Sequence, residues 1–519
     1  MHLRDLLTIQ QPLGPIRHET IMKRSGNGHH NTLIYETGLF HSVLDDNRPL
    51  IIGRRGSGKT AIVSALVARS SLEAHHNHPG DIYVLIDSWS QLDQLVEKVG
   101  LDARHSIGSD SDWSSLLAET VARHWARRLW MVIFDRLYSY CMEDDALRMA
   151  LSPVVKYVEG RDVVPNDREI TDELLNTKFR QIREVVLTYL KDTGKQCVIV
   201  IDSLDEYPIL APRFRRLIAG MLKFVNDLNS DFANVRVVCC IPEEIEPFFA
   251  AQASNYLKDL ADPNVSRLRW RPIDLLRIVA ERYRAFLSLY CDNDNAFLDK
   301  ITRMDFARRR DLREFYLLVM PDTITNRLGR QEPAIAYILR HTQLLPREFL
   351  MIFDAAIVRS HKSNGSWRNI VAEEIVRAVE IKEPMLVNQV MQPYRTIYPE
   401  LLRASQMMLP ELSPICTLGD LDRVKARFGK ACEHETEYPL HTLFEIGVIG
   451  YVDEQATGEF NERYEYGRFH FNSVKPITFA NGRKYCVHPI FSGSWGLQRT
   501  DDRMKCVYPA DVEEIPLEA

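Results

Sequence analysis

The sequence has no long apolar run. Its longest, residues 198–201 and 237–241, are far shorter than the roughly 20 residues that a helix needs to cross a bilayer. Residues 1–12 also lack the apolar core of a signal peptide. We therefore predict a cytoplasmic protein with no membrane partner.

Cysteine is too sparse for a disulfide framework, with nine residues in 519. Cys197, Cys239 and Cys240 lie in apolar, strand-like runs, where a reduced thiol packs as a small hydrophobe. A second group, Cys416, Cys432, His434 and His441, has none of the usual short-paired zinc spacings. We expect reduced cysteines and no zinc site.

Positive charge is also in short supply. Lys+Arg total 65 against 71 Asp+Glu, a net charge of −6, and residues 441–519 carry 8 cations against 12 anions. Because phosphate contacts dominate non-specific affinity for nucleic acid, we interpret this last module as a packing or protein-binding module. Nucleic-acid binding stays open because arginines cluster at two places: Arg123, Arg127 and Arg128, and Arg213, Arg215 and Arg216.

The composition, 45% hydrophobic and 26% charged, is that of a globular protein, and the length suggests about three domains. Strand-like runs at residues 49–52, 81–87, 197–201 and 234–241 alternate with helical patterns at 60–69, 110–129 and 171–190. This alternation predicts an α/β fold with a parallel sheet.

A helical region follows from about residue 256, with no strand signal through residue 360. Helices are expected at 272–287, 294–304, 310–319, 332–340 and 346–360. From residue 438, one helix and short β segments near 451, 464–471 and 484–487 indicate a winged-helix-like α+β module. The expected division is an N-terminal arm (1–35), a core (36–255), a helical lid (256–385) and a C-terminal helical and winged-helix-like module (386–519).

A phosphate-binding loop pattern lies between an expected strand and an expected helix. It comprises Gly53, Arg54, Arg55, Gly56, Ser57, Gly58, Lys59 and Thr60. Glycines at 56 and 58 let the backbone N–H groups from Gly56 to Ala61 point at a β-phosphate. Lys59 is expected to reach the phosphate oxygens, and the Thr60 hydroxyl to ligate Mg²⁺. These residues predict a nucleotide site.

Acidic residues follow the strand expected at residues 197–201. Asp202 should emerge at the carboxyl end of this strand, the edge where open α/β sheets bind ligands, and act on the Mg²⁺ side through water. Glu206, or alternatively Asp205, is expected to activate the water that attacks the γ-phosphate.

Together these motifs resemble the P-loop NTPases of the additional-strand branch, which includes the AAA+ and STAND ATPases. Within it, the chain is similar to bacterial AAA-like ATPases associated with phage-defence loci. Further matches are Leu268-Arg269-Trp270, residues 341–348, residues 443–450 and residues 488–491. The resemblance implies a fold of P-loop core, helical lid and winged-helix-like end, with ATP and Mg²⁺ as cofactors. It also implies a homo-oligomer and a separate effector protein in antiviral defence.

One departure from that family concerns the strand at 234–241, whose tip offers no polar or arginine sensor of the γ-phosphate. This favours slow hydrolysis and a switch over a motor. By the resemblance, Arg347 at a lid helix start is the candidate second sensor, with Arg340 behind it; a salt bridge within the lid is the alternative. An ATP-dependent nucleic-acid remodeller or loader and a nucleotide-holding scaffold remain alternative functions.

Overall fold

The computed structural model describes residues 3–15, 50–63, 82–86, 89–107, 118–161, 177–202, 212–246, 265–291, 295–395, 398, 405–406, 409–429, 438–454, 464–472, 478–497 and 506–509. The chain divides into two units, each described by itself. The sheet unit comprises Phe40–Arg55 and Lys59–Leu268, and the helical unit comprises Met1–Leu39, Gly56–Gly58 and Arg269–Ala519.

A five-stranded sheet of parallel strands, in the order β2-β3-β4-β1-β5, is the centre of the sheet unit. The strands are β1 (Leu50–Gly53), β2 (Ile82–Ile86), β3 (Cys197–Ile201), β4 (Val235–Pro242) and β5 (Val265–Arg267). The prediction of an α/β fold with a parallel sheet is confirmed. Every residue of β3 is buried, because a strand at this position has neighbours on both sides and needs apolar side chains on both faces.

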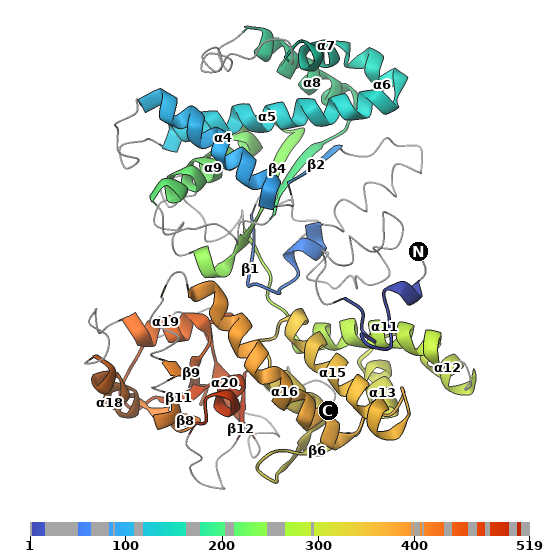
Figure 1. Cartoon of the computed structure of the whole chain (residues 1–519), viewed down its shortest axis with the longest axis vertical. Helices are drawn as coiled ribbons and strands as arrows, with labels where there is room; N and C mark the ends of the chain where they lie inside the picture. The colour runs from blue at the N-terminus through green and yellow to red at the C-terminus, as the bar shows by residue number, and fades with distance from the viewer. Residues whose placement is uncertain are drawn as a thin grey trace. The chain divides into compact units, whose positions relative to one another are not determined.

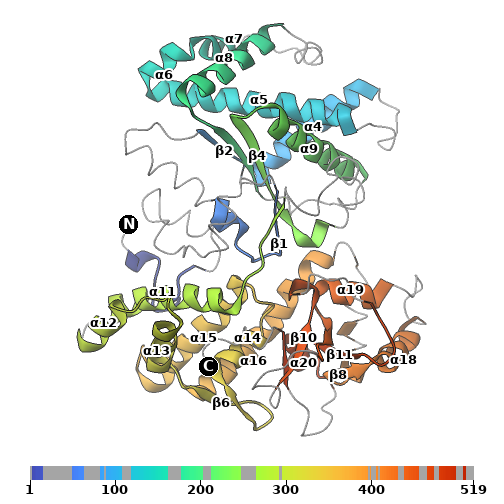
Figure 2. The ribbon, with the colours of Figure 1, turned by 180° about the vertical axis from the view of Figure 1, so that it is seen from behind.

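Helices of the sheet unit pack in layers (Figure 1). They are α4 (Trp89–Ile107), α5 (Ala118–Glu143), α6 (Asp145–Ala150), α7 (Ser152–Arg161), α8 (Thr177–Thr193) and α9 (Pro212–Asp231), with the short 3-10 turn η8 (Glu243–Ile245) after β4. Both views show α6, α7 and α8 on the side of α5 that faces away from the strands (Figure 2). The indole N–H of Trp125 in α5 donates to the Leu217 carbonyl of α9 at 2.8 Å, which joins these two helices in the buried core.

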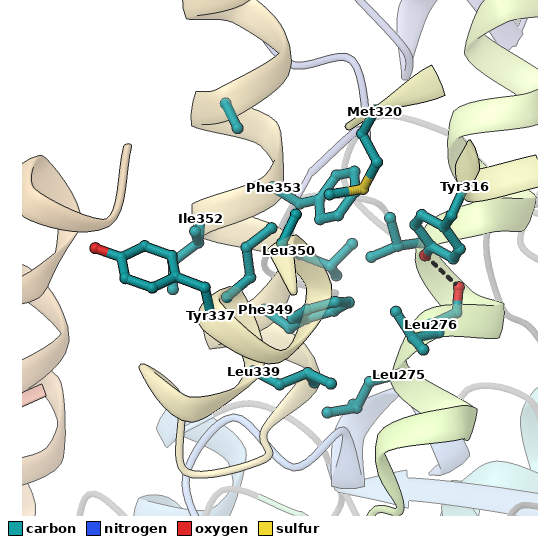
Figure 3. Close-up of a cluster of buried hydrophobic side chains, with 14 of the residues drawn as sticks. Leu275, Leu276, Tyr316, Met320, Tyr337, Leu339, Phe349, Leu350, Ile352 and Phe353 are labelled. Carbon is teal, nitrogen blue, oxygen red and sulfur yellow. Dashed lines mark hydrogen bonds between the residues drawn. The ribbon is translucent and has the colours of Figure 1, made fainter. Parts of the chain in front are cut away.

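The helical unit contains the expected lid helices. They are α11 (Pro272–Tyr290), α12 (Asn295–Thr302), α13 (Arg309–Val319), α14 (Ala334–Arg340), α15 (Pro346–Asn364) and α16 (Ala372–Met391). Figure 3 shows their shared core, in which the Tyr316 hydroxyl donates to the Leu276 carbonyl at 2.8 Å. An aromatic ring buries a large apolar area, and pairing its hydroxyl removes the penalty of burying a polar group.

The expectation that no strand interrupts residues 256–360 is wrong. β5 completes the sheet beside β1, and β6 (Thr323–Thr325) and β7 (Gln331–Pro333) form an antiparallel hairpin. Each of these strands has three residues, too few for an alternating pattern to stand out from the helical sequence around it.

The N-terminal segment packs onto the lid helices, although the sequence suggests only an arm. Leu6, Leu7 and Leu13 are fully buried in the core of the helical unit, after the short turn η1 (Leu3–Asp5). The Leu13 N–H donates to an Asp354 carboxylate oxygen at 3.0 Å, and Arg282 donates to the Leu13 carbonyl at 3.1 Å. Burial raises the pKa of Asp354 to about 7. The described part of the arm is thus part of the folded lid.

The C-terminal α+β module is present as predicted. It comprises η9 (Gln392–Tyr394), η10 (Leu409–Glu411), β8 (Ile415–Thr417), α18 (Leu418–Gly429), α19 (Tyr438–Ile446), β9 (Ile449–Val452), β10 (Tyr464–Arg468), η11 (His470–Asn472), β11 (Lys484–Val487), α20 (Pro489–Ser494) and β12 (Cys506–Tyr508). The strand order is β12-β10-β9-β11-β8. Tyr464, Tyr466, Phe469 and Phe471 are all buried, so these aromatics form a core rather than an exposed base-stacking surface.

Two negative expectations concern membranes and metals. Among the helices that the structure describes, none has the length and apolarity needed to span a bilayer. No group of three or more His, Cys, Asp or Glu side chains in the described ranges is placed to hold a metal ion, although Cys432 and His434 lie outside those ranges. Cys416 is buried in the core of the C-terminal module.

Gly220 in α9 faces α5 at close range. A Cβ at this position would overlap the Val121 side chain of α5 and lie 3.1 Å from the Ala122 nitrogen. We expect Gly220→Ala to lower the free energy of unfolding by about 1–3 kcal/mol, because overpacking forces the helices apart.

Gly160→Ala in α7 is the matched control, since a Cβ there meets nothing within 4 Å. It should raise the free energy by about 0.5–1 kcal/mol through helix propensity alone. Urea unfolding of both variants measures the difference, and a loss of stability in both would contradict the packing argument.

Candidate nucleotide-binding site

The phosphate-binding loop predicted from the sequence follows β1 directly. β1 ends at Gly53, and residues 59–63 are helical. Gly56 and Gly58 have φ angles of +90° and +93°, which glycine adopts freely and other residues rarely do. The two glycines therefore stand where the backbone of the loop turns.

Lys59 lies folded over the start of its own loop. Its ammonium donates to the carbonyls of Gly53 at 2.6 Å and Arg54 at 3.2 Å. Both acceptors are neutral, and among the described carboxylates none forms an ion pair with Lys59. An anion entering the loop would therefore compete with two carbonyl oxygens for the ammonium group.

Thr60 and Asp202 meet at the carboxyl edge of the sheet. The Thr60 hydroxyl donates to an Asp202 carboxylate oxygen at 2.7 Å. Asp202 is 5% exposed, and its backbone N–H donates to the Ile86 carbonyl of β2 at 2.9 Å, so the end of β3 is fixed. A hydroxyl that donates its proton keeps its lone pairs for a cation, and hard oxygen donors are the ligands that Mg²⁺ prefers. The pair fits a Mg²⁺ ion, which would supply charge neutralisation at the phosphates.

Glu244, which the sequence analysis missed, holds the first half of the loop. It lies in η8, directly after β4, and one of its carboxylate oxygens accepts from the Arg55 N–H at 2.9 Å. The side chain is 6% exposed, and its second carboxylate oxygen has no hydrogen-bond partner among the described residues. The signal for it in the sequence is the pair of glutamates that directly follows the apolar run of β4.

Arg347 and Trp270 contact the loop glycines within the helical unit. Arg347 lies in the first turn of α15, and a Cβ placed on Gly56 would lie 3.2 Å from the Arg347 Cβ and 3.5 Å from its Nε. Trp270 donates its indole N–H to the Ser57 carbonyl at 2.7 Å. The structure thus brings the predicted second sensor, Arg347, beside the loop.

Arg340 is engaged elsewhere in the lid. Its guanidinium makes two hydrogen bonds to the Glu332 carboxylate, at 2.9 and 3.0 Å. Although burial disfavours its charge, Glu332 raises the pKa of Arg340 above its ordinary value. If Arg340 moved away from Glu332, a buried carboxylate would lose its positively charged partner, which is costly. Arg340 is therefore a structural ion-pair partner within the lid.

The remaining predicted residues are distributed as follows. Ser57 is fully buried, Arg54 is 4% exposed, and Ala61 lies in the first helical turn after the loop. Asp205 and Glu206, the candidates for activating water, lie outside the described residues. The structure therefore joins the loop to Asp202 and Glu244, and the position of the attacking water rests on the sequence alone.

Comparison with known proteins gives one similar curated sequence. No family model matches the chain. The sequence is 20% identical over 518 residues to the transposon gamma-delta 80.3 kDa protein of Escherichia coli (strain K12). The similarity covers 92% of this chain, which spans 66% of the length of that protein.

Among solved structures, three similar chains are archaeal ATPases or ORC proteins. A Walker-type ATPase of Pyrococcus abyssi is 12% identical, with a TM-score of 0.35 over 80% of this chain and 90% of that one. The Aeropyrum pernix ORC2 protein, solved with ADPNP and ADP, is 10% identical, with a TM-score of 0.37 over 88% of each chain. The Aeropyrum pernix ORC1 protein in complex with DNA is 14% identical, with a TM-score of 0.32 over 82% and 90%.

These likenesses are loose, and the fold is established by features of this chain itself. β4 stands between β1, which carries the loop, and β3, which Asp202 follows. A parallel sheet with a glycine-rich loop between a strand and a helix, and a Thr-Asp pair across the strand ends, is the fold of the P-loop NTPases.

Proposed function

We propose that this protein is a Mg²⁺-dependent ATPase that turns over slowly and works as a nucleotide-controlled switch or assembly platform. The observation that carries the proposal is the hydrogen bond between Thr60 and Asp202. This bond joins a loop residue to the residue that follows β3, although the two are 142 positions apart in the sequence.

Binding of the triphosphate would use groups that the loop already presents. The N–H groups that follow Gly56 and the positive end of the helix at residue 59 favour an anion. Lys59 would exchange its two carbonyl acceptors for phosphate oxygens. Thr60 and Asp202 would hold Mg²⁺, and Arg347 would add a second positive charge near Gly56.

A switch is favoured over a motor because hydrolysis is expected to be slow. Hydrolysis would depend on Glu206, with Asp205 as the alternative, and the tip of β4 supplies no sensor side chain for the γ-phosphate.

Other parts of the proposal rest on the family resemblance. These are assembly as a homo-oligomer, a separate effector protein and a role in antiviral defence. The cytoplasmic location rests instead on the lack of long apolar runs in the sequence.

Replacing the loop lysine tests the binding step. We expect Lys59→Ala to lose ATP affinity by at least tenfold, because a charge-assisted contact with phosphate is worth about 1.5–3 kcal/mol. Titration calorimetry with ATP and Mg²⁺ measures it. Lys223→Ala is the matched control, since Lys223 pairs with Asp227 on α9 at 3.1 Å and should leave binding unchanged. Equal affinity of Lys59→Ala and the parent would refute the nucleotide site.

Replacing the predicted water-activating carboxylate tests hydrolysis separately. Glu206→Gln keeps size and polarity but removes the base, so we expect ATP binding within about twofold of the parent and turnover lowered by about 10²–10⁴-fold. Asp205→Asn is the companion variant that decides between the two acids. Unchanged phosphate release in both variants would remove these residues from the mechanism.

A second candidate, an ATPase that loads or remodels nucleic acid, is favoured by one observation. The curated relative, similar over 92% of this chain, is named for a transposon. This function predicts that duplex DNA or RNA raises the rate of ATP hydrolysis, with binding that weakens steeply between 50 and 200 mM salt. ATP turnover measured with and without nucleic acid at both salt concentrations decides the question. A rate indifferent to nucleic acid at 50 mM salt would exclude this candidate.

A further inference from the structure

Trp270 makes a contact with the phosphate-binding loop that the nucleotide chemistry described above does not use. Its indole N–H donates to the Ser57 carbonyl at 2.7 Å. Its ring also lies beside Gly58, where an added Cβ would come 3.8 Å from the indole Cζ2. The ring packs against the apolar core of the helical unit, and this packing restricts its movement with the loop.

This hydrogen bond fixes the orientation of a single peptide plane. No cis peptide bond occurs among the described residues, so the Ser57 carbonyl and the Gly58 N–H point in opposite directions across a planar trans peptide. A carbonyl held towards Trp270 therefore turns the Gly58 N–H away from Trp270. That N–H is one of the donors that an anion in the loop requires.

The orientation needs an external constraint because the loop alone does not impose it. Gly58 has a φ of +93°, Gly56 has a φ of +90°, and glycine populates positive and negative φ about equally. The peptide between Ser57 and Gly58 can therefore rotate at little steric cost. In the rotated state a carbonyl dipole would replace an N–H donor and repel a phosphate.

We infer that Trp270 is a positioning residue for the loop, which holds the Ser57–Gly58 peptide in the orientation that presents the Gly58 N–H to a β-phosphate. This inference rests on the proposed nucleotide binding and adds a residue to it. ADP and ATP share the β-phosphate, so the affinity of the protein for both should depend on Trp270. AMP lacks this phosphate, so its binding should not depend on Trp270 in this way.

The test compares two tryptophans whose indoles make equivalent hydrogen bonds. Trp270→Phe keeps an aromatic ring and removes the donor. Trp125→Phe removes the bond from Trp125 to the Leu217 carbonyl, 2.8 Å long and within the core of the sheet unit. Because one hydrogen bond contributes about 0.5–1.5 kcal/mol, Trp270→Phe should weaken ADP and ATP binding by about 2- to 10-fold, and Trp125→Phe should leave it unchanged.

A second measurement uses the parent protein and does not depend on how a variant folds. The seven tryptophan indoles are labelled with ¹⁵N, and the resonance missing in Trp270→Phe is assigned to Trp270. Because coupling between two equilibria is reciprocal, ADP should slow hydrogen exchange of this indole N–H and leave that of Trp125 unaffected.

The outcomes separate this inference from the proposed function. Absence of ADP binding by the parent overturns both. Binding by the parent that Trp270→Phe weakens no more than Trp125→Phe overturns the role of Trp270 alone. ADP binding that leaves the exchange rate of the Trp270 indole unchanged does the same. Weaker binding in Trp270→Phe together with slower exchange in the parent supports it.

Discussion

The parallel direction of the five strands is the constraint on which the candidate site depends. Parallel strands bring their carboxyl ends to one edge of the sheet. Gly53 at the end of β1, Asp202 after β3 and Glu244 after β4 therefore lie at the same edge. The register sets their levels, with Ile201 opposite Cys239 and Gly53 opposite Pro242. The loop after β1 is thus one strand away from Glu244 and two strands away from Asp202. Both carboxylates reach it, Glu244 at Arg55 and Asp202 at Thr60.

The two carboxylates at this edge bind opposite ends of the loop. Glu244 accepts the Arg55 N–H near the start of the loop, and Asp202 accepts the Thr60 hydroxyl at its end. Each of these bonds satisfies a donor outside the central Gly-Ser-Gly. The N–H groups in the centre are then the ones presented to an anion, and two fixed ends keep them converging.

How much the sequence predicts depends on how local the signal is. β3 was predicted with its observed bounds because a fully buried strand is apolar along its whole length. β11, Lys-Tyr-Cys-Val, was also predicted with its observed bounds, although only its last three residues are buried. β5, Val-Ser-Arg, has no such pattern: it is a strand because β1 offers it a free edge. β8 is likewise a strand through its pairing with β11. Short strands defined by their partners cannot be recognised from their own residues.

The distinction between local signals and distant partners also explains which residues of the candidate site could be predicted. Lys59 and Thr60 could be predicted because the loop pattern is contiguous, and Asp202 because it directly follows an apolar strand. Glu244 accepts from the backbone N–H of Arg55, and Trp270 donates to the backbone carbonyl of Ser57. Every residue has a backbone carbonyl and every residue except proline a backbone N–H, so these bonds do not depend on the side chain at either loop position. The sequence could not indicate such partners, since nothing in Arg55 or Ser57 specifies a glutamate or a tryptophan far along the chain.

Three tethers therefore hold the loop, and they differ in origin. The tethers at Arg55 and Thr60 come from the ends of β4 and β3, within the sheet unit. The tether at Ser57 comes from Trp270, and the contact at Gly56 from Arg347, both within the helical unit. The peptide between Ser57 and Gly58 is thus held by Trp270, whereas Glu244 and Asp202 hold the two ends of the loop. Changes at the ends of the sheet strands and changes at Trp270 therefore act on different peptides of the loop.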